Sequence, residues 1–254
     1  MIPLLPNLFE KPIPISLPIT GKNTEPTCFG AESPKLETII TNNFIGSVAD
    51  GGFCNHRKLT LTPHGNGTHT ECLGHLTATP LHINQILDCF FFPALLISVQ
   101  PQTTENDFVI KVSSIQKNIE NQKHTSYWYK FSKKALIIRT LPNDESKKHR
   151  QYTTTNPPYF EPAVGEFLAH YDVMHWLCDL PSVDKESDGG ALATHKAFWQ
   201  YPHNPRLKAT ITELIFVPNE ISDGFYWLYL QIINLENDAS PSHPVLYYPS
   251  NFTF

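Results

Sequence analysis

The sequence is poor in cysteine and has no long apolar run, and each shortage excludes a class of protein. Its five cysteines are odd in number and widely spaced over 254 residues, with no C-x-x-C pair. We therefore expect no disulfide framework and a reducing, cytoplasmic location. The longest apolar stretch, at residues 89–99, is shorter than the ~20 residues of a membrane-spanning helix. The N-terminus has no basic leader, and prolines interrupt its apolar residues, so we expect neither a secretory signal nor a membrane partner.

Clusters of basic residues are also missing from the sequence. The 19 Lys and Arg residues are outnumbered by 24 Asp and Glu residues and form no run that could follow a phosphate backbone. Nucleic acid is therefore not an expected partner. A composition of 41% hydrophobic and 17% charged residues is typical of a globular chain. Without an internal repeat or a low-complexity linker, residues 1–254 are predicted to form a single domain.

Hydrophobic periodicity predicts alternating strands and helices in the middle of the chain. Apolar runs at 94–99, 135–139 and 173–178 predict buried strands, and the patterns at 162–170 and 190–200 predict helices. Weaker patterns predict strands at 58–62, 108–112, 210–217, 225–233 and 245–248 and helices at 84–89 and 113–121. This order predicts an α/β domain with a mixed sheet.

Two kinds of segment are predicted to lie at the surface. The polar stretch 143–156 is predicted to be a mobile surface loop. Prolines cluster near both ends of the chain and predict extended, non-helical segments there: Pro3, Pro6, Pro12, Pro14, Pro18, Pro241, Pro244 and Pro249.

The most informative segment is polar and rich in histidine. It reads Pro63-His64-Gly65-Asn66-Gly67-Thr68-His69-Thr70-Glu71-Cys72-Leu73-Gly74-His75. Imidazole nitrogens and carboxylate oxygens are common ligands of zinc and similar divalent metals. The glycines let a loop bend so that side chains close in sequence can converge. A polar surface turn is the alternative, but it does not explain why ligand types gather here.

Two distant segments could complete a metal site that begins in this loop. One contains His195 and the other contains Glu213. Catalytic metal sites take ligands from separated elements, and two bridged metals would need about five to six protein ligands. Taken alone, His195 is better explained as a helix histidine hydrogen-bonded in the core, and Glu213 could face solvent.

The order of these motifs resembles the cyclase family of metal-dependent hydrolases, which includes bacterial kynurenine formamidase and isatin hydrolase. The core motif of that family is H-x-G-T-H-x-D-x-P-x-H. Gly67-Thr68-His69 matches its G-T-H, Glu71 falls on its Asp and His75 falls on its last His. Weaker matches follow in the same order at 15–19, 136–140, 179–184 and 240–245, so the resemblance spans residues 13 to 247.

The sequence departs from the family motif at three positions. Gly65 holds the place of the first His, and His64 lies one residue earlier. Glu71 replaces the Asp, and Leu73 replaces the Pro. We expect a one-residue bulge to bring His64 into the site, with the longer Glu71 side chain compensating for the retracted backbone.

The resemblance implies a fold of the swivelling β/β/α type, a homodimer and a small-molecule amide or acyl substrate. The implied reaction is hydrolysis of an amide or cyclic amide by metal-activated water, as in an arylformamidase of tryptophan catabolism. His75 would be the general acid or base. The implied ligands of one or two divalent ions, zinc first and manganese second, are His64, His69, Glu71, His195 and Glu213. The alternative is a catalytically silent relative that binds a metal or ligand.

Several neighbouring residues have expected supporting roles. Asp179 and Asp184 are predicted to cap or fix loops, and Cys72 is predicted to be a small buried residue beside the site. Phe29, Phe53 and Trp199 are candidates for an aryl pocket. The Phe90–Phe92 run is predicted to lie in the core or at a dimer contact.

Overall fold

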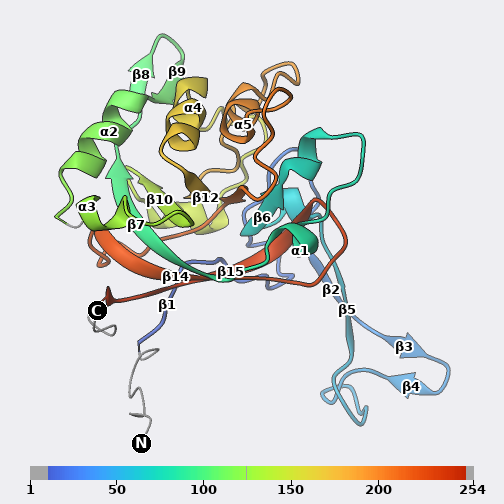
Figure 1. The fold of residues 1–254 in the computed structure, drawn as a ribbon. Helices are drawn as coiled ribbons and strands as arrows, with labels where there is room; N and C mark the ends of the chain where they lie inside the picture. Colours follow the sequence, from blue (N-terminus) through green and yellow to red (C-terminus); the bar gives the residue numbers. More distant parts are fainter. Residues whose placement is uncertain (1–10, 124, 250–254) are drawn as a thin grey trace, which may run out of the picture.

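An eight-stranded mixed sheet forms the centre of the protein in the computed structural model, which describes residues 11–123 and 125–249 (Figure 1). In spatial order its strands are β1 (Ile13–Pro14), β15 (Ala239–Tyr247), β14 (Gly224–Ile232), β7 (Phe91–Val99), β10 (Lys134–Thr140), β12 (Val173–Cys178), β13 (Thr210–Glu213) and β6 (His69–Cys72). β15 also pairs with β6, so all of these strands except β1 close into a barrel-like sheet. The strands from β7 to β13 are parallel, whereas β6, β14 and β15 run antiparallel to their neighbours. The predicted α/β fold with a mixed sheet is confirmed.

The parallel strands are apolar throughout because both of their faces are buried. Along β7, Leu95 and Ile97 face a core that the helices complete, whereas Ala94 and Leu96 face a second core that β14 and β15 complete. Phe92 is buried in this second core, as predicted for one part of the phenylalanine run. Side chains alternate between the two faces of each strand, so each strand contributes to two separate hydrophobic clusters.

The four described α-helices from residue 112 onward pack on the first core, whereas the helix Ile83–Ile86 packs on the second core. Their bounds are α1 (Ile83–Ile86), α2 (Val112–Glu120), α3 (Thr125–Trp128), α4 (Pro162–His170) and α5 (Ala193–Trp199). Figure 1 shows α2, α4 and α5 side by side above the sheet, on the side opposite β14 and β15. Over residues 11–123 and 125–249, the helices are too short and too polar for any of them to cross a membrane.

α4 and α5 pack unusually close together at Gly165. A Cβ atom added there would lie 2.7 Å from both the Phe198 nitrogen and the Thr194 oxygen, and 3.0 Å from the Ala197 Cβ. Only glycine lets the two helices approach this closely. The contact fixes the position of α5, which carries His195.

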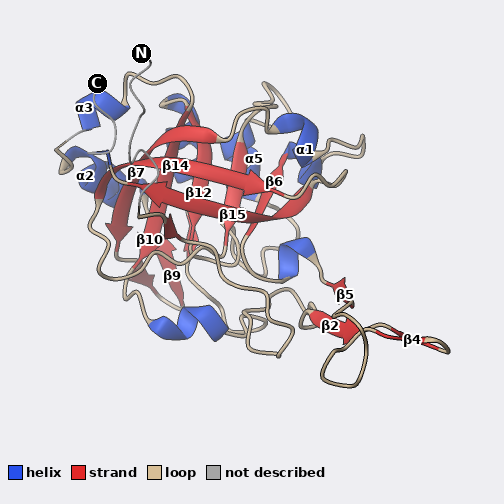
Figure 2. Cartoon of the chain, turned by 90° about the horizontal axis from the view of Figure 1, so that it is seen from below, coloured by secondary structure: helices blue, strands red, loops and turns tan. Residues whose placement is uncertain are grey.

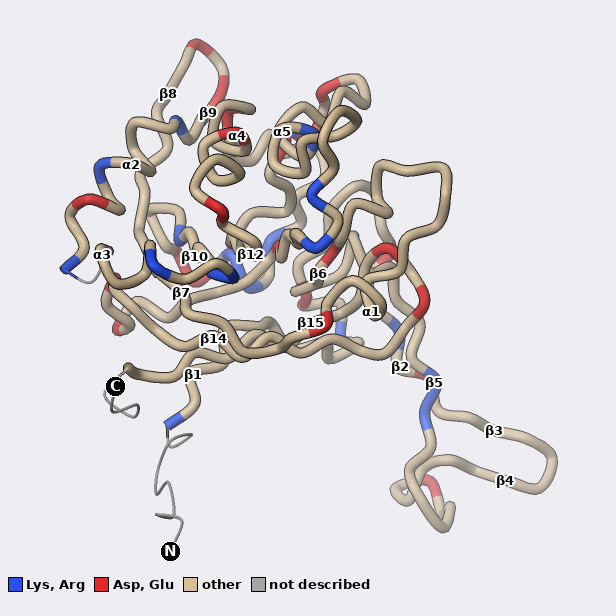
Figure 3. Tube along the Cα trace, viewed as in Figure 1, with Lys and Arg blue, Asp and Glu red and all other residues tan. Residues whose placement is uncertain are grey.

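A hairpin arm, residues 35–60, projects from the body. It consists of β2 (Lys35–Thr38), β3 (Ile40–Thr41), β4 (Phe44–Ile45) and β5 (Arg57–Thr60). Figures 1 and 2, which view the molecule from directions 90° apart, both show the outer part of the arm standing clear of the body. A second small sheet joins β8 (Gln102–Thr104), β9 (Asp107–Ile110) and β11 (Tyr159–Phe160). Figure 3 shows Lys and Arg interleaved with Asp and Glu along the described trace.

Some sequence predictions are wrong in part. The histidine-rich segment is not a loop throughout, because His69–Cys72 forms β6 between two short 3₁₀ helices, Pro63–Gly65 and Leu73–Leu76. The stretch 143–156 contains a third 3₁₀ helix, Glu145–His149, and is anchored by buried Lys147, whose Nζ lies 2.8 Å from Asp179 Oδ2. A buried ion pair at its centre is incompatible with a wholly mobile surface loop.

Other predictions fall close to the observed elements. The 162–170 helix and the 173–178 strand match α4 and β12 residue for residue. The 190–200 helix is shorter, because Leu192 adopts φ 46° immediately before α5. Pro241 and Pro244 lie in extended β15 as predicted, whereas Pro3 and Pro6 lie outside the described residues.

The close approach at Gly165 gives a test of the packing that holds α5. We expect Gly165→Ala to lower the free energy of unfolding by about 1–3 kcal/mol, because overpacking outweighs the gain in helix propensity of about 0.5–1 kcal/mol. Denaturant unfolding measures this difference. Glu166→Ala, on the exposed face of the same helix, is the control and should change stability little. Equal stability of Gly165→Ala and the natural protein would contradict the close packing.

Candidate metal centre

The register of β6 against β13 brings the first three site residues together. His69 pairs with Glu213 across the two antiparallel strands, and Glu71 lies two residues further along β6. Side chains two residues apart share one face of a strand, so His69, Glu71 and Glu213 point to the same side. The closest atoms of the pair, His69 Nε2 and Glu213 Oε2, are 3.4 Å apart. All three side chains are buried.

His64 reaches the same site from the 3₁₀ turn before β6. Its Nδ1 lies 3.1 Å from Glu71 Oε2, so the imidazole points toward the carboxylate. Gly65 occupies the family position of the first His and packs directly against Ala31. A Cβ atom at residue 65 would lie 2.3 Å from the Ala31 Cβ. A histidine at residue 65 would therefore clash, and the imidazole is supplied from residue 64 instead.

His195 enters the site from α5 and is held on both sides by carboxylates. Its Nε2 lies 2.8 Å from Glu71 Oε1, and its Nδ1 lies 2.6 Å from Asp184 Oδ2. Asp184 also accepts a hydrogen bond of 2.7 Å from the Thr194 backbone N–H, in the first turn of α5. The predicted capping role of Asp184 is confirmed, and the same carboxylate orients the His195 ring.

Each of the three imidazoles has one nitrogen fixed by an outer acceptor. The outer partners are Asp238 for His64 Nε2, the Gly67 carbonyl for His69 Nδ1, and Asp184 for His195 Nδ1. The other nitrogen of each ring faces Glu71 or Glu213. Histidine metal ligands are commonly held in this way, with the second ring nitrogen hydrogen-bonded to a carboxylate or carbonyl.

One inward-facing nitrogen is buried without a hydrogen bond from the described residues, although it lies 3.4 Å from Glu213 Oε2. His69 Nε2 makes no hydrogen bond to any described residue. Most buried polar atoms are paired, so an unbonded nitrogen among other ligand-type groups is a candidate to bind a ligand or ion. The donors of His64, His69 and Glu71 lie within 4.8 Å of one another, as do those of Glu71, His75 and His195. The donor set of imidazoles and carboxylates therefore fits a divalent cation.

The charges in the cluster depend on one another. Burial alone would lower the pKa of His64, but hydrogen bonds to Asp238 and Glu71 raise it to about 10. Burial opposes charge on His195 as well, yet the Glu71 charge and the hydrogen bond to Asp184 raise its pKa well above the usual value. Burial would raise the pKa of Glu71, but His195 and His75 hold it well below its ordinary range. Protons on the imidazoles thus balance the negative charge of the carboxylates in this cluster. A bound cation would displace those protons.

A cavity of about 400 Å³ opens beside the cluster. Its walls are formed by Phe29, His64, Glu71, His75, Ser182, Asp184, Lys185, Glu186, Asp188, Gly190, Leu192, His195 and Glu213. Of the three aromatic candidates from the sequence, Phe29 lines this cavity. Trp199 is buried behind His195, with ring centroids 5.4 Å apart, and Phe53 is fully exposed on the arm.

The sequence predictions missed Asp238 in this site. Its Oδ2 lies 2.8 Å from His64 Nε2 and 3.4 Å from His75 Nδ1. The sequence did offer one indication, because Asp238 lies two residues before the segment 240–245 that the resemblance had matched. Nothing in the linear sequence says that this segment pairs with β6, so the signal could not be used.

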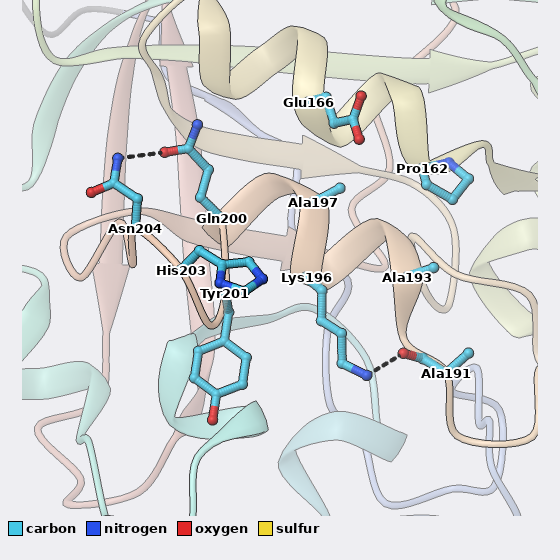
Figure 4. Close-up of a pocket in the computed structure, with 10 residues that line it drawn as sticks. All are labelled: Pro162, Glu166, Ala191, Ala193, Lys196, Ala197, Gln200, Tyr201, His203 and Asn204. Carbon is cyan, nitrogen blue, oxygen red and sulfur yellow. Dashed lines mark hydrogen bonds between the residues drawn. The ribbon is translucent and has the colours of Figure 1, made fainter.

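A larger cavity, of about 570 Å³, lies between α4 and the segment around α5 (Figure 4). Lys196 reaches across one wall to donate a hydrogen bond of 2.6 Å to the Ala191 carbonyl, and Glu166 lines the opposite wall from α4. The only other ionisable lining residues are Tyr201 and His203. The convergent imidazoles and carboxylates lie in the smaller cavity, so chemistry is expected there.

The raised pKa of His64 predicts how the metal-free protein responds to pH. A histidine with a raised folded-state pKa contributes stability that is complete below its unfolded pKa and lost as the pH rises. We expect the free energy of unfolding of metal-free protein to fall between pH 6.5 and about 10, with His195 adding to the loss. Denaturant titrations across this range measure the slope. His64→Gln should make the decline shallower, and a slope equal to that of the natural protein would contradict the assignment.

Comparison with known proteins agrees with this fold. The sequence matches the Cyclase family model, described as "Putative cyclase", over residues 13–185. It has no significant match among curated proteins. A predicted metal-dependent hydrolase from Bacillus stearothermophilus is 17% identical with a TM-score of 0.62, over 93% of this chain and 97% of that one.

Two isatin hydrolases share the same fold. Isatin hydrolase A from Labrenzia aggregata is 12% identical with a TM-score of 0.64, over 93% of each chain. Isatin hydrolase A from Ralstonia solanacearum is 13% identical with a TM-score of 0.64, over 93% of this chain and 91% of that one. Because the family model covers well over half of the sequence, the chain belongs to the Cyclase family, as its motifs predicted.

Proposed function

We propose that this protein is a divalent-metal-dependent hydrolase of amide or cyclic amide bonds, with arylformamidase-like activity. The observation that carries the proposal is the buried His69 Nε2, which makes no hydrogen bond to a described residue, in a ring of imidazoles and carboxylates beside a cavity. Family membership and the fold shared with isatin hydrolases support the same reaction class.

The proposed ligands are the ones that the sequence nominated. Their donor atoms are His64 Nδ1, His69 Nε2, His195 Nε2 and the carboxylates of Glu71 and Glu213. Nitrogen and oxygen donors of this kind suit zinc first and manganese second. Glu71 contacts both His64 and His195 through different oxygens, so it could bridge two ions. When bound, such a cation supplies Lewis-acid activation of water and of the scissile carbonyl.

We propose that His75 is the general acid or base that transfers a proton during amide hydrolysis. It lies in the 3₁₀ turn after β6 and lines the cavity, and its side chain is 28% exposed. A partly exposed imidazole at the edge of a substrate cavity can accept a proton from the attacking water at Nε2 and then give it to the leaving amine as the amide bond breaks. Its Nδ1 faces Asp238 at 3.4 Å, which directs Nε2 toward the substrate space.

The cavity wall favours small substrates without net negative charge. About 400 Å³ is within the range of small-molecule sites. Beyond Glu71 and Glu213, the lining carries Asp184, Glu186 and Asp188 against the single ammonium group of Lys185. Phe29 and Leu192 supply apolar contact. An uncharged aryl formamide or a small cyclic amide satisfies these conditions, and turnover of formylkynurenine would connect the protein to tryptophan catabolism.

Metal analysis and a turnover assay test the proposal together. Protein purified without chelator should contain zinc or manganese and hydrolyse an aryl formamide. His69→Gln and Glu213→Gln should each lose most of the metal, whereas His75→Gln should keep it and lose about 10²–10⁴-fold in kcat. His203→Gln, on the other cavity, is the matched control. Bound metal without turnover across an amide panel would favour a silent binding relative, and metal-free, inactive protein would refute the proposal.

We further propose that the protein is a cytoplasmic homodimer that associates through the arm. Two-stranded hairpins are marginally stable on their own, and this arm exposes several large apolar side chains. Phe53 is 100% exposed, and Ile40, Val48 and Leu59 are exposed as well. Several exposed large apolar side chains on one projecting segment favour a protein interface there. The cysteines all carry free thiols, which is compatible with a reducing compartment.

Mass measurement in solution tests the dimer. We expect light scattering after size exclusion to give twice the chain mass of 28.8 kDa at micromolar concentration. The double variant Val48→Ser, Phe53→Ser should move the equilibrium to monomer because it removes exposed apolar surface from the arm. Phe108→Ser, an exposed phenylalanine outside the arm, should leave the dimer intact. A natural protein that is monomeric under these conditions would overturn this proposal.

A further inference from the structure

Asp238 is held at the edge of the metal cluster by the pairing of β15 with β6. Ala239 pairs with Glu71, and the Cys72 backbone N–H donates a hydrogen bond of 3.0 Å to the Asp238 carbonyl. The turn that carries His75 closes over this point because residue 74 is glycine. A Cβ atom at Gly74 would lie 3.1 Å from the Asp238 Cβ and 2.2 Å from the Leu81 oxygen. Sheet register and this close contact together fix the position of Asp238 relative to His75.

One oxygen of Asp238 contacts two imidazoles with different proposed roles. Oδ2 lies 2.8 Å from His64 Nε2 and 3.4 Å from His75 Nδ1. The two rings lie against each other, with centroids 4.4 Å apart and planes 37° apart. A carboxylate oxygen has two lone pairs and can accept both N–H bonds. All three side chains are about one-quarter exposed, so the group sits at the cavity mouth.

We propose that Asp238 is a positioning residue that sets the tautomers of His64 and His75. It accepts the Nε2–H of His64, which leaves Nδ1 as the nitrogen that faces the metal cluster. It also accepts the Nδ1–H of His75, which leaves the Nε2 lone pair directed at the substrate space. A hydrogen bond to one ring nitrogen determines which nitrogen carries the proton and how the ring is oriented. The second effect rests on the proposed function of His75, whereas the first does not.

The same arrangement explains how the chain tolerates its shifted histidine. Because Gly65 is packed against Ala31, a side chain at residue 65 cannot supply the imidazole; His64 supplies it and approaches Glu71 through Nδ1. Nδ1 can act as a ligand only when Nε2 carries the proton, and Asp238 is the group that accepts this proton. The competing assignment is a second cation held by His64, His75 and Asp238 directly, since their donors also lie within 4.8 Å of one another.

The Asp238→Asn variant of the full chain tests the proposal with two readouts. Kinetically, we expect kcat for an aryl formamide to fall about 10–100-fold, with KM changed far less and the number of bound zinc ions unchanged at saturating zinc. Structurally, long-range ¹H–¹⁵N spectra of zinc-loaded protein should show His75 as the Nδ1–H tautomer, and Asp238→Asn should shift it toward Nε2–H. The His75→Gln variant assigns the signal. Glu236→Gln, an exposed carboxylate two residues away, should change neither readout.

Each result has a definite consequence. Unchanged kcat together with an unchanged His75 tautomer would overturn the positioning role, and loss of one zinc equivalent would replace it with a ligand role. Asp238→Glu should recover part of the activity, because it restores a carboxylate acceptor. If Asp238→Asn does not fold, Asp238→Ser provides the same comparison. If the natural protein lacks turnover, the proposed function fails, while the spectra still decide whether Asp238 sets the tautomers.

Discussion

The site depends on one constraint, the register of β6 between β13 and β15. Pairing with β13 sets His69 opposite Glu213, and pairing with β15 sets Glu71 opposite Ala239. A slip of one residue along β6 would turn His69 and Glu71 to the opposite face, because side chains alternate along a strand. β6 is only four residues long, yet its neighbours on both sides hold it within a closed sheet. The short 3₁₀ turns at its two ends then deliver His64 and His75 to the same face.

The cost of burying these charged groups explains why the cluster is so fully connected. An isolated buried carboxylate is strongly unfavourable, so Glu71 and Glu213 require partners. Glu71 contacts His64 through one oxygen and His195 through the other, and Glu213 accepts a hydrogen bond of 2.9 Å from the Val183 backbone N–H. The outer acceptors orient the imidazoles in turn. Such a network is preorganised because the outer acceptors hold the donors in fixed orientations, and a bound cation would displace the protons that the imidazoles and carboxylates share.

The helices position part of the metal site as well as covering the hydrophobic core. α5 carries His195, and its position follows from three contacts: the close approach at Gly165, the Asp184 carboxylate at its first turn, and the buried Trp199 ring behind the imidazole. Trp199 also donates a hydrogen bond of 2.9 Å to the Ala209 carbonyl, immediately before β13. The helix that supplies His195 is therefore tied directly to the strand that supplies Glu213.

The strands and helices with a clear pattern in their own residues could be predicted from the sequence. Continuous apolar runs predicted β7, β10 and β12, and Pro162 at the first turn marked the start of α4. The type of chemistry was also readable, because imidazoles, carboxylates and glycines gathered within a short segment, and the resemblance connected that segment to His195 and Glu213. The same reasoning misread His69–Cys72 as loop, because a strand of His, Thr, Glu and Cys lacks the hydrophobic pattern on which strand prediction depends.

Which groups meet in the site, and through which atoms, depends on how remote segments pair and pack in three dimensions. Asp238 lies 174 residues from His64 and reaches it because β15 happens to pair with β6. The packing of Gly65 on Ala31 excludes a histidine at residue 65, and His64 faces Glu71 through Nδ1. Such contacts arise from strand pairing and backbone packing between remote segments. The free energy of this pairing and packing is spread over the whole core, so no local sequence pattern predicts it.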